Sequence, residues 1–156
     1  MKVLSLDQSS NKTGFAVFED GELKIHNIID LSKCKNLEMR INQMMVKINI
    51  LIEKILPDAI VFEDVNFQSN VGTLTILARL QGAIILSAIK HDINYEIYKP
   101  SHWRKILGFK QGKSVGREAL KTQALSYIQN KYSIQTKEDI AEAICIGDAF
   151  LLANKK

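Results

Sequence analysis

The apolar residues of this chain change their spacing once, near residue 37, and that change limits the folds open to it. Before it, short apolar runs of strand type follow one another at residues 2–7, 13–18 and 23–29. Asp20-Gly21 lies between the second and third runs, and an Asp-Gly pair there is a strong hairpin signal. The first thirty residues therefore predict an antiparallel meander of three strands.

After the change, segments of helix type and strand type alternate. Apolar residues recur every three or four positions between Leu37 and Ile55, which is typical of an amphipathic helix that Pro57 then ends. Gly82, inside a later helix, predicts close packing by a neighbouring element. The remaining expected elements are strands at 59–63 and 95–98 and helices at 73–90, 114–129 and 137–153.

This order predicts an α/β fold with one five-stranded mixed sheet flanked by helices. The first three strands would be antiparallel, and the two that each follow a helix would be parallel. The sequence contains neither an internal repeat nor a composition shift that would mark a boundary. We therefore expect residues 1–156 to form a single domain.

Composition excludes several classes of protein. Hydrophobic residues make up 46% of the chain and charged residues 24%, which is ordinary for a globular domain with a real core. No apolar run reaches the length of a membrane span, and the first residues lack the apolar stretch of a signal peptide. Cys34 and Cys145 are far apart and have no metal-ligand spacing, which is typical of reduced thiols. We expect a cytoplasmic protein without a membrane partner.

Four acidic residues stand where a site would form. Asp7 and Glu63 each close an apolar strand, and sites of open α/β sheets lie at the carboxyl ends of such strands. Asp139 and Glu142 are three residues apart, so they share one face of the last expected helix. The alternative is that these are solvated acids, which are common at strand ends and at helix N-termini.

A hard divalent cation is what would bring four carboxylates together. Mg²⁺ and Mn²⁺ prefer oxygen ligands, and two such ions about 3.5–4 Å apart can activate a water and stabilise the leaving oxygen of a phosphodiester. His26, His91 and His102 are scattered and form no metal motif. The sequence thus predicts a site for Mg²⁺ or Mn²⁺, with two ions, whose ligands are Asp7, Glu63, Asp139 and Glu142.

A basic segment follows at residues 99–121. It carries a charge of +6, whereas the whole chain carries only +4. Such a segment beside a site for cations and phosphates favours binding of a nucleic-acid backbone, although a solvated surface is the alternative. Trp103 within it is expected to pack in the core rather than to stack on a base. Lys113, Arg117 and Lys121 are four residues apart, so they form one stripe if a single helix includes all three. The basic residues of the segment are Lys99, Arg104, Lys105, Lys110, Lys113, Arg117 and Lys121.

Four stretches carry a resemblance to a known family over most of the chain. They are LSLDQSSNKTG at 4–14, IVFE at 60–63, QSN at 68–70 with LQGA at 80–83, and DIAEAI at 139–144. Together they resemble the RuvC family of Holliday-junction resolvases, particularly its small bacteriophage-type members. The resemblance implies a ribonuclease H-like fold, a homodimer, and cleavage of branched DNA such as four-way junctions that depends on Mg²⁺ or Mn²⁺ and needs no nucleotide cofactor.

The resemblance also implies roles for the four acids. Asp7 would bridge both metal ions, Glu63 and Glu142 would be further ligands, and Asp139 would complete the set. Metal-bound water would attack the phosphodiester, so no side chain of the protein would serve as the nucleophile.

The chain departs from the family pattern at two positions. Glu142 stands where the family usually has aspartate, which keeps the charge but lengthens the side chain. Asn66 stands where many members have an aromatic residue, and Phe67 follows it. With Asn70, these residues are expected to contact DNA, and the substitution at position 66 bears on junction and sequence selectivity.

Other functions compete with this one. The Asp-turn-Thr-Gly start also resembles the phosphate loop of actin-like ATPases, but 156 residues are too few for their two tandem domains. A P-loop motif is not present. A non-catalytic module for branched DNA should have lost one of the acids, and all four are present. A nuclease of the same fold acting on RNA–DNA hybrids or other nucleic acids stays open.

Overall fold

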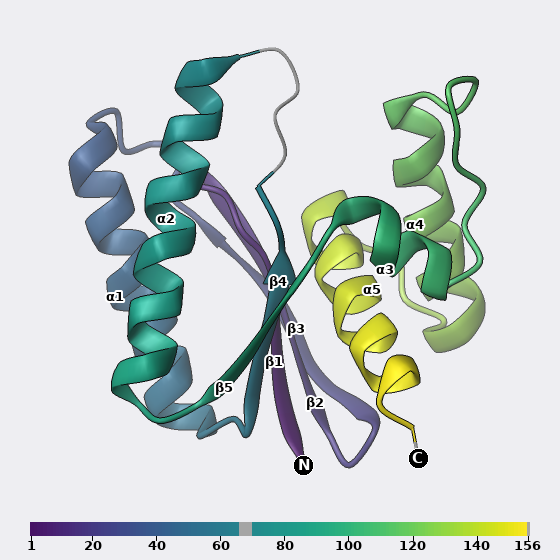
Figure 1. Cartoon of the computed structure of the whole chain (residues 1–156), viewed down its shortest axis with the longest axis horizontal. Helices are drawn as coiled ribbons and strands as arrows, with labels where there is room; N and C mark the ends of the chain where they lie inside the picture. Colours follow the sequence, from purple (N-terminus) through teal and green to yellow (C-terminus); the bar gives the residue numbers. More distant parts are fainter. Residues whose placement is uncertain (66–69, 156) are drawn as a thin grey trace.

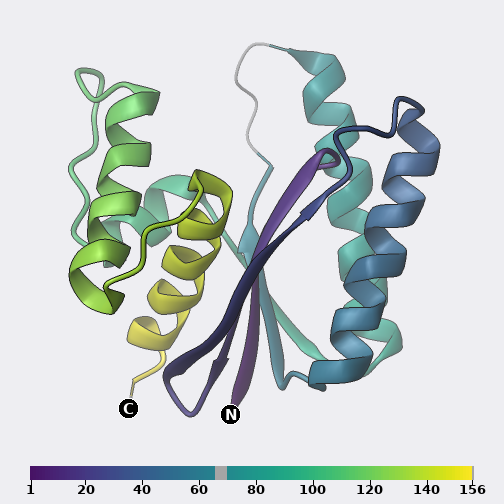
Figure 2. The same ribbon diagram turned by 180° about the vertical axis from the view of Figure 1, so that it is seen from behind.

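The computed structural model describes residues 1–65 and 70–155, which form a five-stranded sheet between two layers of helices (Figure 1). The strands are β1 (Lys2–Asp7), β2 (Lys12–Glu19), β3 (Glu22–Asp30), β4 (Ala59–Glu63) and β5 (Asn94–Tyr98). The helices are α1 (Leu37–Ile55), α2 (Val71–Lys90), α3 (Pro100–Ile106), α4 (Arg117–Tyr132) and α5 (Glu138–Ala153). Helices α1 and α2 cover one face, and α3, α4 and α5 lie on the other, as the reverse view also shows (Figure 2).

The sheet has the strand order β3-β2-β1-β4-β5. Strands β1, β2 and β3 pair antiparallel, whereas β4 pairs parallel with both β1 and β5, which confirms the predicted mixed sheet. Asp20 and Gly21 both have positive φ, at 52° and 84°, as the tight hairpin predicted for them requires. Because β1 and β4 are parallel neighbours, their carboxyl ends meet at the same edge of the sheet.

Strand β1 runs through the middle of the core. Successive side chains of a strand point to opposite faces, so Val3 packs toward α5 while Leu4 packs toward α1 and α2. Both of these side chains are fully buried. A strand covered on both faces cannot shift its register without exposing apolar surface, and this fixes the position of its last residue, Asp7.

Helix α5 lies directly on the sheet because small residues let it approach. The Ser5 hydroxyl of β1 donates a hydrogen bond of 2.8 Å to the carbonyl oxygen of Ala143 in α5. A Cβ atom on Gly147 would overlap the ring of Phe18 in β2. A Cβ atom on Gly14 would overlap the carbonyl oxygen of Asp139. Gly14 and Gly147 therefore determine how close the first and third turns of α5 come to the sheet.

Some local expectations are wrong. Pro100 was expected only to stop a strand, but it begins α3, because its fixed φ suits the first turn of a helix. Helix α4 begins at Arg117 rather than at residue 114, so Lys113 lies outside it and the expected helical stripe of three cations is not formed. A Cβ atom on Gly82 would meet no atom within 4 Å, so that glycine is not a site of close packing.

The expectation about membrane spans also needs correction for α2. This helix is long and apolar enough to cross a membrane by length and composition alone, with a mean hydropathy of 1.5. Its Leu80 and Ile84 pack fully buried in the core that α1 and α2 share with the sheet, as befits an outer helix of an α/β domain. Its other face is exposed, including Leu86 and Ile89 at 67% and 60%.

Candidate active site

The four predicted acids belong to three elements that meet at one edge of the sheet. Asp7 ends β1, Glu63 ends β4, and Asp139 and Glu142 lie in the first two turns of α5, whose N-terminal end is at the same edge (Figure 1). The rule that sites form at the carboxyl ends of parallel strands places Asp7 and Glu63 together, and the structure brings these two strand ends to the same edge. Gly14 pairs with Asp7 in the register of β1 and β2, and it also lies close against the backbone of Asp139. This contact holds the end of β1 near the start of α5.

Burial and repulsion by neighbouring acids raise the pKa of Asp7, Glu63 and Glu142. The pKa of Asp7 lies well above its usual range, first because the group is desolvated and then because Glu142, Glu63 and Asp139 repel its negative charge. Burial raises the pKa of Glu63 to about 7, although hydrogen bonding from Trp103 opposes that rise. Burial likewise raises the pKa of Glu142. The cluster therefore favours bound positive charge, either protons or a cation.

One cation of the chain already lies between two of the acids. The Nη2 atom of Arg104, from α3, is 3.8 Å from Oε1 of Glu142 and 4.0 Å from Oε2 of Glu63. All three side chains are largely shielded, with exposed fractions of 16%, 20% and 25% in the order given. Arg104 thus partly offsets the negative charge where screening by water is weak.

Hydrogen bonds fix the end of β4 around Glu63. Trp103 of α3 donates from Nε1 to Oε2 of Glu63 at 2.6 Å. The side-chain amide of Gln8 donates to the backbone carbonyl of Glu63 and so joins the ends of β1 and β4. Gln81 of α2 accepts from the Val65 backbone at 3.2 Å. The end of β4 and the residues just after it are therefore held by contacts to α3, α2 and the end of β1.

The chemistry of these donors fits a hard divalent cation. All four are carboxylates, which Mg²⁺ and Mn²⁺ prefer, and their shared charge would be lowered by a cation. In residues 1–65 and 70–155, no three His, Cys, Asp or Glu side chains are yet gathered at the spacing of a metal centre. The fit to the ion is therefore one of ligand type and charge.

The predicted DNA contacts consist of cations paired with acids, residues of the segment after Glu63, and exposed cations. The paired cations are Arg104, which faces the candidate acids, and Lys121 of α4, whose Nζ lies 2.6 Å from Oε2 of Glu138. Asn70 accepts hydrogen bonds from the backbone N–H groups of residues 72 and 73, so it caps α2, while Asn66 and Phe67 lie outside the described residues. The exposed group consists of Lys99, Lys105, Lys110, Lys113 and Arg117.

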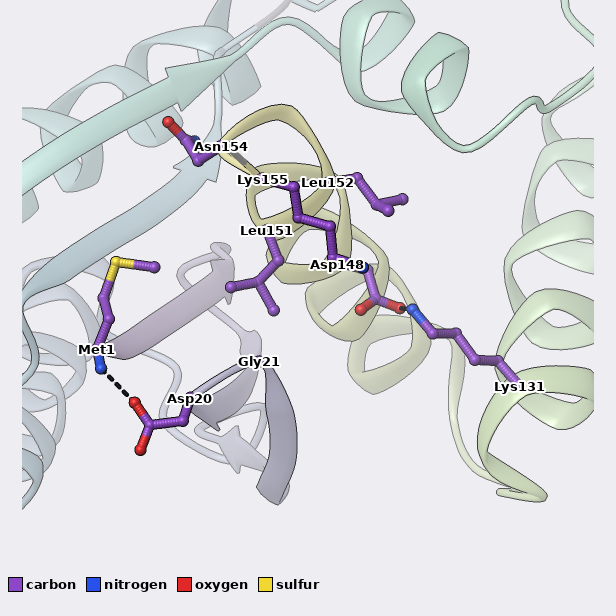
Figure 3. Close-up of a pocket in the computed structure, with 9 residues that line it drawn as sticks. All are labelled: Met1, Asp20, Gly21, Lys131, Asp148, Leu151, Leu152, Asn154 and Lys155. Carbon is purple, nitrogen blue, oxygen red and sulfur yellow. Dashed lines mark hydrogen bonds and ion pairs between the residues drawn. The ribbon is translucent and has the colours of Figure 1, made fainter.

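A cavity of about 320 Å³ lies at the other edge of the sheet and contains none of the four acids (Figure 3). It lies beside the chain termini, where the Met1 ammonium is 2.6 Å from the Asp20 carboxylate. Asp148, 2% exposed, contacts Lys131 at 2.9 Å and accepts a hydrogen bond of 2.7 Å from Tyr132, so it ties α5 to α4. The lining groups Met1 and Asp20 pair with each other, as do Lys131 and Asp148, and the cavity is not the candidate active site.

Sequence reasoning missed two neighbours of the acids. Trp103 was correctly expected to be buried, but nothing in the sequence linked it to Glu63, which lies 40 positions earlier. Arg104 was assigned to the basic segment, whereas it lies against the carboxylates. Both come from α3, so the omission of that helix removed the signal that could have found them.

Comparisons with known proteins agree with this geometry. Residues 3–148 match the family described as crossover junction endodeoxyribonuclease RuvC. The RuvC of Finegoldia magna is 25% identical over 160 residues, which cover 99% of this chain and 95% of the relative. The RuvC of Caldicellulosiruptor saccharolyticus is 24% identical over 162 residues, with 99% and 94% covered.

A solved structure shows the same fold. The RuvC of T. thermophilus, in complex with Holliday junction substrate, superposes with a TM-score of 0.79 at 14% identity and covers 97% of this chain and 94% of its own. This agreement extends over both helical layers and confirms the ribonuclease H-like architecture expected from the resemblance. The chain belongs to the RuvC family of crossover junction endodeoxyribonucleases.

Proposed function

We propose that this chain resolves Holliday junctions by metal-dependent hydrolysis of phosphodiester bonds. The observation that carries the proposal is the convergence of four carboxylates at the edge of the sheet where β1 and β4 end. The raised pKa values of Asp7, Glu63 and Glu142 support a site that binds a cation rather than a set of solvated acids. Family membership supports the same reaction and substrate.

Asp7, Glu63, Asp139 and Glu142 would hold Mg²⁺ or Mn²⁺, two ions to a site. When bound, such ions supply an activated water and stabilise the leaving oxygen. Asp7, half-buried and close enough to the other three acids to be affected by their charges, would be one of the ligands. The guanidinium of Arg104 would face the scissile phosphate or its neighbour, since Arg binds phosphate oxygens well and this one is already at the site.

The basic segment of residues 99–121 would bind the DNA backbone. Its exposed cations, Lys99, Lys105, Lys110, Lys113 and Arg117, stand on or beside α3 and α4, the helices next to the acids. Phosphate contacts position a duplex without reading its sequence, which suits a protein that recognises a branch. Asn66, Phe67 and Asn70, in the segment that follows Glu63, would contact DNA at the branch itself.

A second copy of the chain would complete the enzyme. Helix α2 is long and rich in apolar residues, and its outward side leaves Leu86 and Ile89 exposed, while α1 beside it exposes Val46 and Ile50. Apolar patches of this kind commonly mark an interface. A symmetric homodimer would carry two sites and could cut two strands of a junction. Each copy would act as one nuclease domain, in the cytoplasm.

Substitution of Asp7 tests the proposal. Asp7→Asn keeps the size of the side chain but removes the charge that a cation needs. We expect cleavage of a four-way junction to fall to background while junction affinity, measured in chelator, stays within about twofold. Glu22→Gln makes the same change at an exposed position of β3, away from the acids, and should leave cleavage unchanged. Wild-type turnover by Asp7→Asn protein would contradict the proposal.

A further inference from the structure

Trp103 is the single tryptophan of the chain, and it is placed beside a proposed metal ligand. It lies in α3 with no exposed surface. A buried indole N–H needs a hydrogen-bond partner, because it has been removed from water. Its partner is Oε2 of Glu63, at 2.6 Å. The interaction therefore joins the layer of α3 to the end of β4.

The indole ring is itself held in place by its neighbours. Phe109 packs edge-on against it, with ring centroids 5.7 Å apart at an angle of 72°. Phe109 makes the same type of contact with Tyr127 of α4, at 5.8 Å. The guanidinium of Arg104 lies 4.8 Å from the centre of the Trp103 ring. With these contacts the ring has little freedom to rotate, so the direction of its N–H is fixed by packing.

Both contacts to the Glu63 carboxylate are made at the same oxygen. Oε2 accepts the bond from Trp103 and is the atom 4.0 Å from Arg104. A carboxylate held through one oxygen keeps its plane and presents the other oxygen in a defined direction. Partners of this kind commonly orient metal ligands and raise affinity for the ion.

We propose that Trp103 is a positioning residue, which fixes the Glu63 carboxylate through its indole N–H so that Oε1 is oriented for a divalent cation. This inference rests on the proposed function and deepens it. A core tryptophan with only a packing role would not require the N–H at all. The two roles can therefore be separated by removing the N–H while keeping the shape of the ring.

The test replaces the single tryptophan biosynthetically. β-(3-Benzothienyl)alanine has nearly the shape of tryptophan but no donor, and 5-fluorotryptophan retains the donor and serves as the matched control. We expect the benzothienyl protein to bind Mn²⁺ about tenfold more weakly in the absence of DNA, measured by the electron paramagnetic resonance of the free ion. The Mg²⁺ concentration for half-maximal cleavage should rise by a similar factor, while junction affinity in chelator stays unchanged.

A second measurement on the unmodified protein does not depend on how well the analogue folds. The single indole N–H resonance should shift when Mg²⁺ is added, and the shift should be absent in Asp7→Asn protein. The positioning role would be overturned by unchanged Mn²⁺ affinity in a folded benzothienyl protein. It would also be overturned if the indole resonance does not shift with Mg²⁺ while the wild-type protein cleaves. Either result would leave the proposed function standing. Wild-type protein that neither binds Mn²⁺ nor cleaves would instead overturn the proposed function, and this inference with it.

Discussion

At the scale of single residues, the site is a group of acids that the fold holds closer than their charges favour. Asp7 lies among Glu63, Asp139 and Glu142, and its pKa is raised accordingly. The rest of the fold must supply the free energy that keeps such a group together, as tightly packed Gly14 and the hydrogen bonds to Glu63 do. Without a cation, the protein should relieve the repulsion by binding protons.

Stability should therefore depend on pH in a defined direction. Glu63 has a pKa of about 7 in the folded protein, against an ordinary value of 4.5. The folded state binds this proton more tightly, so its stabilising effect is complete below pH 4.5 and is lost as the pH rises toward 7. We expect the free energy of unfolding to fall by about 3 kcal/mol across that window if Glu63 acts alone. Asp7 and Glu142 shift in the same direction.

Urea unfolding at several pH values, with and without Mg²⁺, would measure this. Saturating Mg²⁺ should remove most of the fall, because the cation replaces the protons. Glu63→Gln should reduce the slope, whereas the exposed Glu53→Gln should not. Stability that is flat or rises between pH 5 and 7 without Mg²⁺ would mean that the acids do not repel one another as described.

The grouping of the four candidate acids could be anticipated from sequence, because each follows a simple local rule. Asp7 and Glu63 end apolar strands, and Asp139 and Glu142 share a helix face. Their support could not be predicted in the same way. The bond from Trp103 to Glu63 depends on where α3 lies in three dimensions, and no periodicity in the sequence encodes that.

At the scale of elements, the position of α5 on the sheet determines half of the site. Gly14 of β2 allows the first turn of α5 to approach, and a Cβ atom there would overlap the Asp139 carbonyl oxygen. That atom is backbone, so it cannot move aside as the end of a flexible side chain could. The helix as a whole would have to shift, and Asp139 and Glu142 would shift with it.

Gly14→Ala should thus destabilise the protein by about 1–3 kcal/mol and sharply lower cleavage. Gly82→Ala is the matched control, because a Cβ atom there would meet no atom within 4 Å and alanine favours the helix. It should stabilise by up to about 1 kcal/mol, and it is a control for stability alone because it lies on the exposed side of α2 proposed as the dimer interface. Denaturant unfolding of both variants and junction cleavage by Gly14→Ala protein would check this. Normal cleavage by Gly14→Ala protein would show that the approach of α5 does not position the acids.

The elements that sequence predicted poorly lie between β5 and α4. A proline after a strand indicates the end of that strand, but Pro100 suits the first turn of a helix equally well, and so α3 was missed. Helix α4 begins later than expected because the chain before it is held as a loop. The Gln123 side chain accepts from the backbone N–H of Lys110 and donates to its carbonyl, at 2.7 and 3.0 Å.

At the scale of the whole molecule, charge is divided unevenly. Residues 99–121 carry +6 while the chain carries +4, so the remainder is net negative. The segment belongs to α3, α4 and the loop between them, beside the acidic site. DNA phosphates that bind this basic side of the molecule would lie next to the carboxylates, as cleavage of the DNA backbone requires.

Charge reversal would locate the DNA surface. Lys113→Glu with Arg117→Glu should weaken junction binding and reduce its dependence on salt by roughly two units of slope, one for each phosphate that is no longer neutralised. Lys24→Glu with Lys155→Glu makes the same change in net charge near the β2–β3 hairpin and the C-terminus, where both residues are exposed and far from the acids, and should affect the slope far less. Fluorescence anisotropy in chelator at increasing salt would measure both. Equal effects of the two double variants would show that net charge, rather than a specific binding surface, governs affinity.

The whole-molecule architecture was largely predictable, because the order of strands and helices leaves few topologies for one sheet. The meander and the parallel strands were predicted and are confirmed. The exposure of the outward face of α2 was not predicted, because a helix rich in apolar residues on all sides has the same sequence pattern in a core and at an interface. Only the fold shows that Leu86 and Ile89 are exposed.

Cleavage of an end-labelled substrate panel would test the proposed reaction most directly. The panel would contain a four-way junction, a three-way junction, a flap, a linear duplex and an RNA–DNA hybrid, each with Mg²⁺, Mn²⁺ or chelator and with Asp7→Asn protein alongside. A homodimeric resolvase should make paired, symmetric nicks in the four-way junction with either metal, and none in chelator or with the variant. Preferential cutting of the hybrid, or tight junction binding without any cut, would contradict the account.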